Sequence, residues 1–154
     1  PAGASVASAT FTLCPTRTNP DAAGRVHEVS RALGAWSESA VDWNNQPPAL
    51  SPPTASSAYL GGLGCVNFDV TADVVAWVGG AANFGWLVKD EIEDSSGCAV
   101  TYGSRENDDT SLAPTLTVTF AFSGGLPAAA PSGEGASYAG ALAMPGAFGV
   151  GFGY

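Results

Sequence analysis

The side chains best suited to chemistry in this sequence are carboxylates, and many of them gather in two short acidic runs. One run occupies residues 90–94 and the other residues 106–109. Loop carboxylates are ligands that Ca²⁺ prefers, so the runs suggest a structural calcium site. The candidate ligands are Asp90, Glu93, Asp94, Glu106, Asp108 and Asp109. The alternative, which we favour, is that both runs are solvated loops, because neither has EF-hand spacing.

Recognisable catalytic motifs are missing from the sequence. The single histidine, His27, has no serine or cysteine partner motif, and no G-x-S-x-G occurs. A carboxylate pair could always be chosen from 14 acidic residues, so such a choice has no specificity. No C-x-x-C occurs either, which argues against the common zinc and haem motifs. We therefore expect no enzyme, no catalytic residues and no cofactor other than the calcium considered above.

Two tryptophans, Trp36 and Trp43, are the candidates for a binding surface. An aromatic ring face gives apolar contact to a pyranose ring without needing charge, as in a carbohydrate-binding platform. The alternative, which we favour, is structural. In that case the indole N–H groups are bonded internally and hold a long loop against a sheet.

Arg105 is one of only five cationic residues, and it lies between Ser104 and Glu106. A guanidinium in this setting favours a bidentate pair with a carboxylate, and Glu38 is the candidate partner. We expect the Glu38–Arg105 pair to be structural, with ligand binding by Arg105 as the alternative.

The three cysteines, Cys14, Cys65 and Cys98, permit at most one internal disulfide. Cys14 and Cys65 continue the alternation of their strands onto the polar face, whereas Cys98 shares its parity with Val100 and Tyr102. Parity therefore favours a Cys14–Cys65 disulfide, although a β-bulge would break this parity.

Composition and charge narrow the class of protein. The formal charge is 5 − 14 = −9, and no basic stripe is present for nucleic-acid phosphates. The same excess of negative charge disfavours binding to anionic lipid. It also disfavours binding to an acidic polysaccharide unless a cation bridges the two. No stretch reaches the roughly 20 apolar residues of a membrane span. Abundant Gly, Pro, Thr and Val with few Lys and Glu favour an all-β protein.

The chain divides after residue 122 into a module and a tail. Residues 1–122 carry every charged residue except Glu134, whereas residues 123–154 are dominated by Gly, Ala and Pro. Apolar alternation predicts strands at residues 9–13, 66–70 and 115–122, and shorter signals add 26–29, 84–88 and 98–102. Residues 15–24 and 44–64 contain many turn formers and are predicted to be loops.

Residues 71–78 are the one predicted helix. Thr71 is its expected cap, Asp73 lies in the first turn, and Val74, Trp77 and Val78 share a face. Short strands joined by long loops, together with one brief helix, suggest an all-β sandwich or jelly roll.

Three segments carry a resemblance to a known family. Residues 36–47 resemble the pattern W-x-E-x-x-V-x-W-N-N-Q-P, and residues 68–89 resemble F-D-V-T, V-x-x-W and N-x-G-x-x-L-K in order. Ser104-Arg105-Glu106 followed by Pro114-Thr-Leu116 resembles S-R-E and P-x-L. Together they are similar to the DNRLRE domain group, which is related to carbohydrate-binding module family 96 and to disaggregatase-related repeats.

The resemblance covers roughly residues 1–122. It implies a secreted β-jelly roll without catalytic machinery, often appended to surface or polysaccharide-active proteins, and hence an extracellular, cell-surface or luminal location. Family members usually carry further strands before the segment that matches residues 1–10, and residues 123–154 have no counterpart. We therefore expect a jelly roll with a vacant strand position and an additional apolar segment.

The tail has the pattern of a docking segment. Phe148, Val150, Phe152 and Tyr154 alternate with glycines, so an extended strand would place all four on one face and leave the other bare. Such a strand suits addition to a sheet edge, in its own chain or in a neighbour's. The alternative is a tail draped over its own module or over an unrelated partner. The apolar anchors are Tyr138, Leu142, Met144, Phe148, Val150, Phe152 and Tyr154.

Two functions from different classes follow from these patterns. The first is a non-catalytic structural or interaction subunit of an extracellular or luminal assembly, docked through its tail to other protein chains. If a neighbouring copy receives the tail, head-to-tail repetition gives a filament. The alternative is a secreted carbohydrate-binding module that recognises a polysaccharide.

Overall fold

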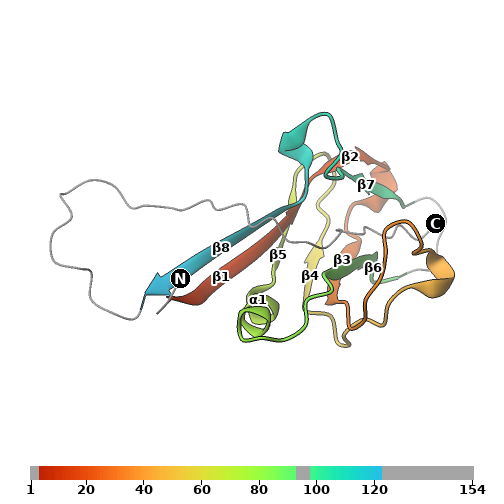
Figure 1. Ribbon diagram of the computed structural model, residues 1–154. Coiled ribbons are helices and arrows are strands. Elements are labelled where there is room, and N and C mark those ends of the chain that lie inside the picture. Colours follow the sequence, from red (N-terminus) through yellow and green to blue (C-terminus); the bar gives the residue numbers. More distant parts are fainter. Residues whose placement is uncertain (1–3, 93–97, 123–154) are drawn as a thin grey trace, which may run out of the picture.

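The protein is mostly β, with one short helix. The computed structural model describes residues 4–92 and 98–122, which form eight strands, one α-helix and three 3-10 turns (Figure 1). The strands are β1 (Ala4–Leu13), β2 (Pro15–Thr18), β3 (Val26–Arg31), β4 (Ala55–Ala58), β5 (Val66–Asp69), β6 (Trp86–Asp90), β7 (Val100–Tyr102) and β8 (Thr115–Phe122). The helical elements are α1 (Thr71–Val78), η1 (Pro20–Ala22), η2 (Trp43–Asn45) and η3 (Thr110–Leu112). The expected β class is confirmed.

The strands form three small antiparallel sheets, with the orders β5-β1-β8, β2-β7 and β4-β3-β6. The first and third sheets supply most of one hydrophobic core, to which β7 of the second sheet adds Val100 and Tyr102. Within it the Phe11 ring of β1 stacks on the Trp86 ring of β6, with centroids 5.2 Å apart, and the ring of Phe68, the cross-strand partner of Phe11 on β5, lies 6.3 Å away. These three small sheets do not by themselves establish the expected jelly-roll arrangement of strands.

Strand β1 follows the predicted alternation, with Ala9, Phe11 and Leu13 almost fully buried. It begins at Ala4, five residues earlier than predicted. A bulge at Ala7 lets Val6 pair with Phe120 and Ser8 with Thr119. Because the extra residue resets the parity, Val6 also packs against the core although it lies three positions before Ala9.

Two of the predicted loops contain strands. Residues 15–24 include β2, which pairs with β7, and residues 44–64 include β4, which pairs with β3. The sequences Pro-Thr-Arg-Thr and Ala-Ser-Ser-Ala have no run of large apolar residues. These strands are therefore specified by their partners, and the loop prediction was wrong there.

Helix α1 has the predicted bounds, but its details differ. Val70 is the N-cap and makes no side-chain capping bond. The Thr71 hydroxyl instead accepts a hydrogen bond from the Ala9 amide at 2.9 Å and donates to Asp69 at 2.6 Å. Val78 is 63% exposed and does not share the core-facing side with Val74. Within the described residues, no helix has the length and apolar character needed to cross a membrane.

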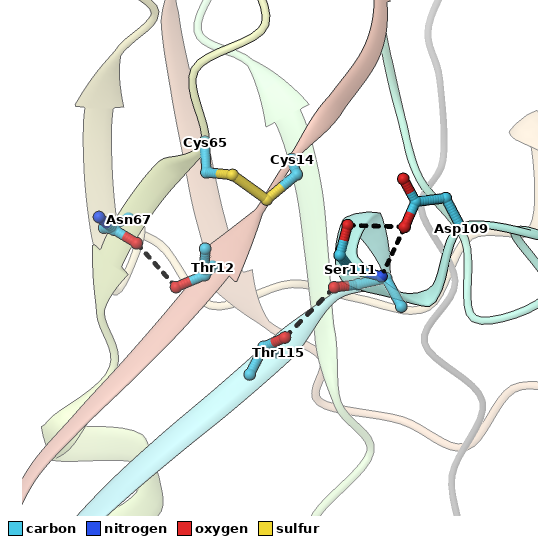
Figure 2. The surroundings of a disulfide bond; sticks show 8 residues. Thr12, Cys14, Cys65, Asn67, Asp109, Ser111 and Thr115 are labelled. Carbon is cyan, nitrogen blue, oxygen red and sulfur yellow. Dashed lines mark hydrogen bonds between the residues drawn. A yellow bond between two sulfur atoms is a disulfide. The ribbon is translucent and has the colours of Figure 1, made fainter.

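A disulfide joins Cys14, directly after β1, to Cys65, directly before β5 (Figure 2). This is the pair that strand parity favours, while Cys98 is free. The bond extends the last rung of the β1–β5 ladder, Leu13 with Val66. On the polar face beside it, the Thr12 hydroxyl donates to Asn67 at 2.7 Å. Closing a 51-residue separation restricts the unfolded chain, which on a loop-entropy estimate is worth about 4 kcal/mol.

Candidate functional site

Within the described residues, the longest connection between two strands joins β3 to β4 through residues 32–54, which we call the Trp loop. Its base continues the sheet: Ala32 bridges to Ala49, the Leu33 amide donates to Pro48 at 2.7 Å, and the Leu50 amide donates to Arg31 at 2.9 Å. These backbone bonds bring the two ends of the loop together on β3. The loop is therefore fixed where it leaves and rejoins the sheet.

The tip of the Trp loop is built by short-range hydrogen bonds from Asp42 and Asn45. The Asp42 carboxylate accepts from the Asn44 and Asn45 amides at 2.8 and 3.2 Å, which caps η2. In return the Asn45 side chain accepts from the Asp42 amide at 2.6 Å and donates to the Ala40 carbonyl at 2.8 Å. This reciprocal capping box gives the polar residues around Trp43 a structural reason for their spacing.

The two tryptophans have different environments. Trp36 is half-buried, and its indole N–H donates to the Phe84 carbonyl at 2.7 Å, as the structural alternative anticipates. Trp43 is 57% exposed on η2, and within residues 4–92 and 98–122 its indole N–H has no hydrogen-bond partner. No ring contact joins the two indoles in this part of the chain. Of these two tryptophans only Trp43 presents an exposed ring, and the internal bonding expected for both indoles is wrong for it.

The Glu38–Arg105 pair is present and ties the Trp loop to the segment after β7, but the expected bidentate geometry is wrong, because only one guanidinium nitrogen contacts Glu38. Arg105 Nη2 lies 3.1 Å from Glu38 Oε2, and Arg105 Nε donates to Glu106. The hydrogen bond from Arg105 lowers the pKa of Glu106 and, reciprocally, raises the pKa of Arg105. All three side chains are more than half exposed, so the network orients the loop more than it stabilises the fold.

Of the four calcium candidates in the described residues, Asp90, Glu106 and Asp109 bond to neighbouring protein groups, whereas Asp108 is exposed and makes no such bond. Asp90 forms an ion pair with Arg25 at 2.8 Å and accepts from the Ile92 amide. Asp109 caps η3 by accepting from the Ser111 amide and hydroxyl, bonds that lower the pKa of Asp109 (Figure 2). Among residues 4–92 and 98–122, no three acidic, histidine or cysteine side chains gather as a metal site. Glu93 and Asp94 lie outside the described residues, so the calcium site stays a prediction.

The comparison with protein families decides the class of this module. The model of carbohydrate-binding module family 96 matches residues 1–120. The chain belongs to this family. No curated protein and no solved structure matches it. The family 96 match spans all three sheets of the described structure, including the Trp loop and the Glu38–Arg105 pair.

Asp73 is a buried polar centre of the family 96 module that sequence reasoning placed only in a first turn. Its carboxylate is 3% exposed and accepts from the Thr54 hydroxyl and the Trp86 indole N–H, both at 2.7 Å. Arg31 Nη1 lies 3.8 Å from its other oxygen. Asp73 thus joins α1 to β3, to β6 and to the end of the Trp loop. The sequence feature that could have identified Asp73 is that an acidic side chain stands among the apolar residues of the predicted helix.

His27 is the second buried polar centre. Its Nδ1 lies 2.5 Å from the Tyr102 hydroxyl oxygen, and its ring stacks on Tyr59 with centroids 5.7 Å apart. Burial lowers the pKa of His27, against the opposing effect of Asp90 and with a smaller contribution from Arg25. Burial also raises the pKa of Tyr102. Both groups are neutral at neutral pH and hydrogen-bonded to each other, an arrangement that supports the core.

The stability of the module should therefore fall as the pH is lowered below about 6.5, the ordinary histidine pKa. The unfolded chain binds the His27 proton at that pH, whereas the folded chain binds it only at a lower pH. In this window the free energy of unfolding should drop by up to about 1.4 kcal/mol per pH unit. Urea titrations between about pH 5 and pH 7 measure this slope. His27→Gln should reduce it, and an unchanged slope in that variant would contradict the assignment.

The tail anchors lie outside the described residues, so the structure does not place them. They are Tyr138, Leu142, Met144, Phe148, Val150, Phe152 and Tyr154. Sequence reasoning also missed two exposed leucines between β4 and β5, Leu60 and Leu63, which are 89% and 61% exposed. Their signal is a pair of large apolar residues among glycines, in residues 60–64.

Proposed function

We propose that this chain is a non-catalytic carbohydrate-binding module that contacts a polysaccharide through Trp43. The observation that carries the proposal is an exposed indole on a capped, internally bonded turn. A ring held in place before binding loses little conformational entropy when a sugar stacks on it. The family match supports the ligand class.

The surroundings of Trp43 suggest how a sugar would be oriented. Asn44 and Asp42 flank Trp43 in the sequence and are exposed, and Glu38 of the same loop pairs with Arg105, which follows β7. Such groups hydrogen-bond to sugar hydroxyls, while the ring supplies the apolar contact. The net charge of −9 favours a neutral polysaccharide over an acidic one, which would need a bridging cation.

Replacing Trp43 by alanine should weaken polysaccharide binding at least about tenfold, since roughly 1.4 kcal/mol of stacking is lost. Affinity electrophoresis against a panel of soluble polysaccharides measures the change, after a glycan array has selected the ligand. The fold should be unaffected because the side chain is already 57% exposed.

Leu63→Ala is the matched control, because it removes an equally exposed apolar side chain from a different loop. It should bind as the unmodified protein does. Retained binding in the Trp43 variant, or no binding of any polysaccharide by the unmodified protein, would refute the proposal.

Two further properties belong to this proposal. We place the protein outside the cytosol, at the cell surface or in an extracellular or luminal space, which the Cys14–Cys65 disulfide supports. We also propose that the sheets belong to one jelly-roll sandwich, supported by the core that the first and third sheets share. A role as a subunit of an assembly or filament is supported only by the tail sequence, and the family match favours carbohydrate binding.

A further inference from the structure

Strand β8 has an open edge. It pairs with β1 along one side, and no described strand pairs with its other side. Its sequence, Thr-Leu-Thr-Val-Thr-Phe-Ala-Phe, contains no charge and no proline. Natural edge strands are usually protected by such residues or by a covering segment, because an open row of backbone groups recruits another strand. β8 lacks the side-chain protection, so its edge is open to a covering segment.

The outer half of the β1–β8 pair has even less support. β5 pairs with β1 only from Thr10 to Leu13, so residues 4–8 and 119–122 form a ribbon of two strands (Figure 1). Two strands alone are marginally stable in water. On the inward face of β8, Leu116, Val118 and Phe120 alternate with exposed residues but are only half-buried. Their apolar surface is therefore incompletely covered by the described residues.

The same chain contains a segment that fits this edge. Residues 148–154 read Phe-Gly-Val-Gly-Phe-Gly-Tyr, close to the eight residues of β8 in length. As a strand, the segment would place its large side chains beside Leu116, Val118 and Phe120, with glycine on the polar side. Main-chain bonds to the edge and pockets for alternate side chains are the usual basis of strand addition.

The connection favours the same chain over a second copy. Residues 123–147 separate β8 from this segment and are mostly Gly, Ala and Pro. For a Gly-rich sequence of that length, the random-coil end-to-end distance is roughly 25–30 Å, about the length of β8 at roughly 3.3 Å per residue. A tether matched to its span gives an effective concentration of order millimolar, above ordinary protein concentrations.

We propose that residues 148–154 add as an edge strand to β8 of their own chain and complete the first sheet. The proposal is independent of carbohydrate binding, since β8 and the Trp loop belong to different sheets. It also identifies the acceptor edge for the strand addition that the tail sequence suggests.

Amide hydrogen exchange followed by NMR on the full chain tests this proposal. Every second amide of β8 points away from β1 and should exchange slowly if a strand covers the edge. Gly151→Pro removes a donor and blocks pairing at the centre of the segment, so these amides should exchange at least about tenfold faster. Gly140→Pro is the matched control, because it introduces the same residue into the linker and should leave the exchange rates unchanged.

Light scattering on the same samples decides which chain provides the strand. A monomer with slow outward amides in the unmodified chain, and fast ones only in Gly151→Pro, supports the proposal. Equal exchange rates in all three proteins would overturn it. Protection that appears only with a dimer and vanishes on dilution would overturn it too, because the strand would then come from a second copy.

Discussion

Replacing Asp73 by alanine should lower the free energy of unfolding by about 3–4 kcal/mol. The substitution leaves the Trp86 indole N–H without an acceptor in the core and removes the acceptor of the Thr54 hydroxyl. It also removes the carboxylate that faces the partly buried Arg31 guanidinium. Each buried donor without a partner costs about 1–3 kcal/mol. Urea unfolding followed by tryptophan fluorescence measures the loss as a lower midpoint with an unchanged slope.

Asp73→Asn separates the hydrogen bonds from the charge. The amide oxygen can still accept from Trp86 and Thr54, so this variant should lose clearly less stability than Asp73→Ala. A further control is Asp69→Ala, which removes an exposed carboxylate that bonds only to Thr71 among the described residues. If the Asp73 and Asp69 alanine variants were equally stable, the buried carboxylate would not organise the core.

Gly103→Ala should destabilise the protein by at least about 3 kcal/mol, at the upper end for overpacked sites. Gly103 follows β7 and is buried, and its amide donates to the Cys14 carbonyl at 3.0 Å. A Cβ at this position would lie 2.2 Å from the carbonyl oxygen of Leu112 and 2.9 Å from its carbonyl carbon. Both are backbone atoms, so the strain cannot be relieved by a rotamer change. Thermal unfolding by circular dichroism is a sufficient measurement.

Gly64→Ala provides the comparison for the effect of alanine itself. Its Cβ would meet nothing within 4 Å, and its φ does not lie in the left-handed region. We expect this variant to unfold within about 0.5 kcal/mol of the unmodified protein, as is usual at open surface positions. Similar losses at both glycines would show that the close approach of residues 103 and 112 carries no energetic weight.

The strands and the helix that could be predicted are those whose own residues show a regular pattern of apolar side chains. Alternation at residues 9–13, 66–70 and 115–122 identified β1, β5 and β8, and the bounds of α1 followed from residues 71–78. In contrast, β2 and β4 consist of small or polar residues and exist because β7 and β3 pair with them. Pairing between distant segments is a tertiary property, so no local pattern carries it.

The residues of the candidate site could be predicted from the sequence, but which of them support the fold and which are exposed for binding could not. Trp36 and Trp43 are the same residue type in one signature, and only burial and the bond to Phe84 distinguish the structural indole from the exposed one. Asp73 shows the same limit, since its partners Thr54 and Trp86 come from separate segments. Such contacts depend on how the loop and the sheets meet.

The way the base of the Trp loop is bonded determines which parts of the loop sequence can be replaced. Arg31, Ala32 and Leu33 meet residues 48–50 through main-chain atoms, and these bonds do not depend on which side chains occupy the tip. A different stretch of similar length around Trp43 would leave these main-chain bonds in place. On the function proposed above, recognition and folding are then encoded in separable parts of the chain, and exchanging the tip alone should change the specificity.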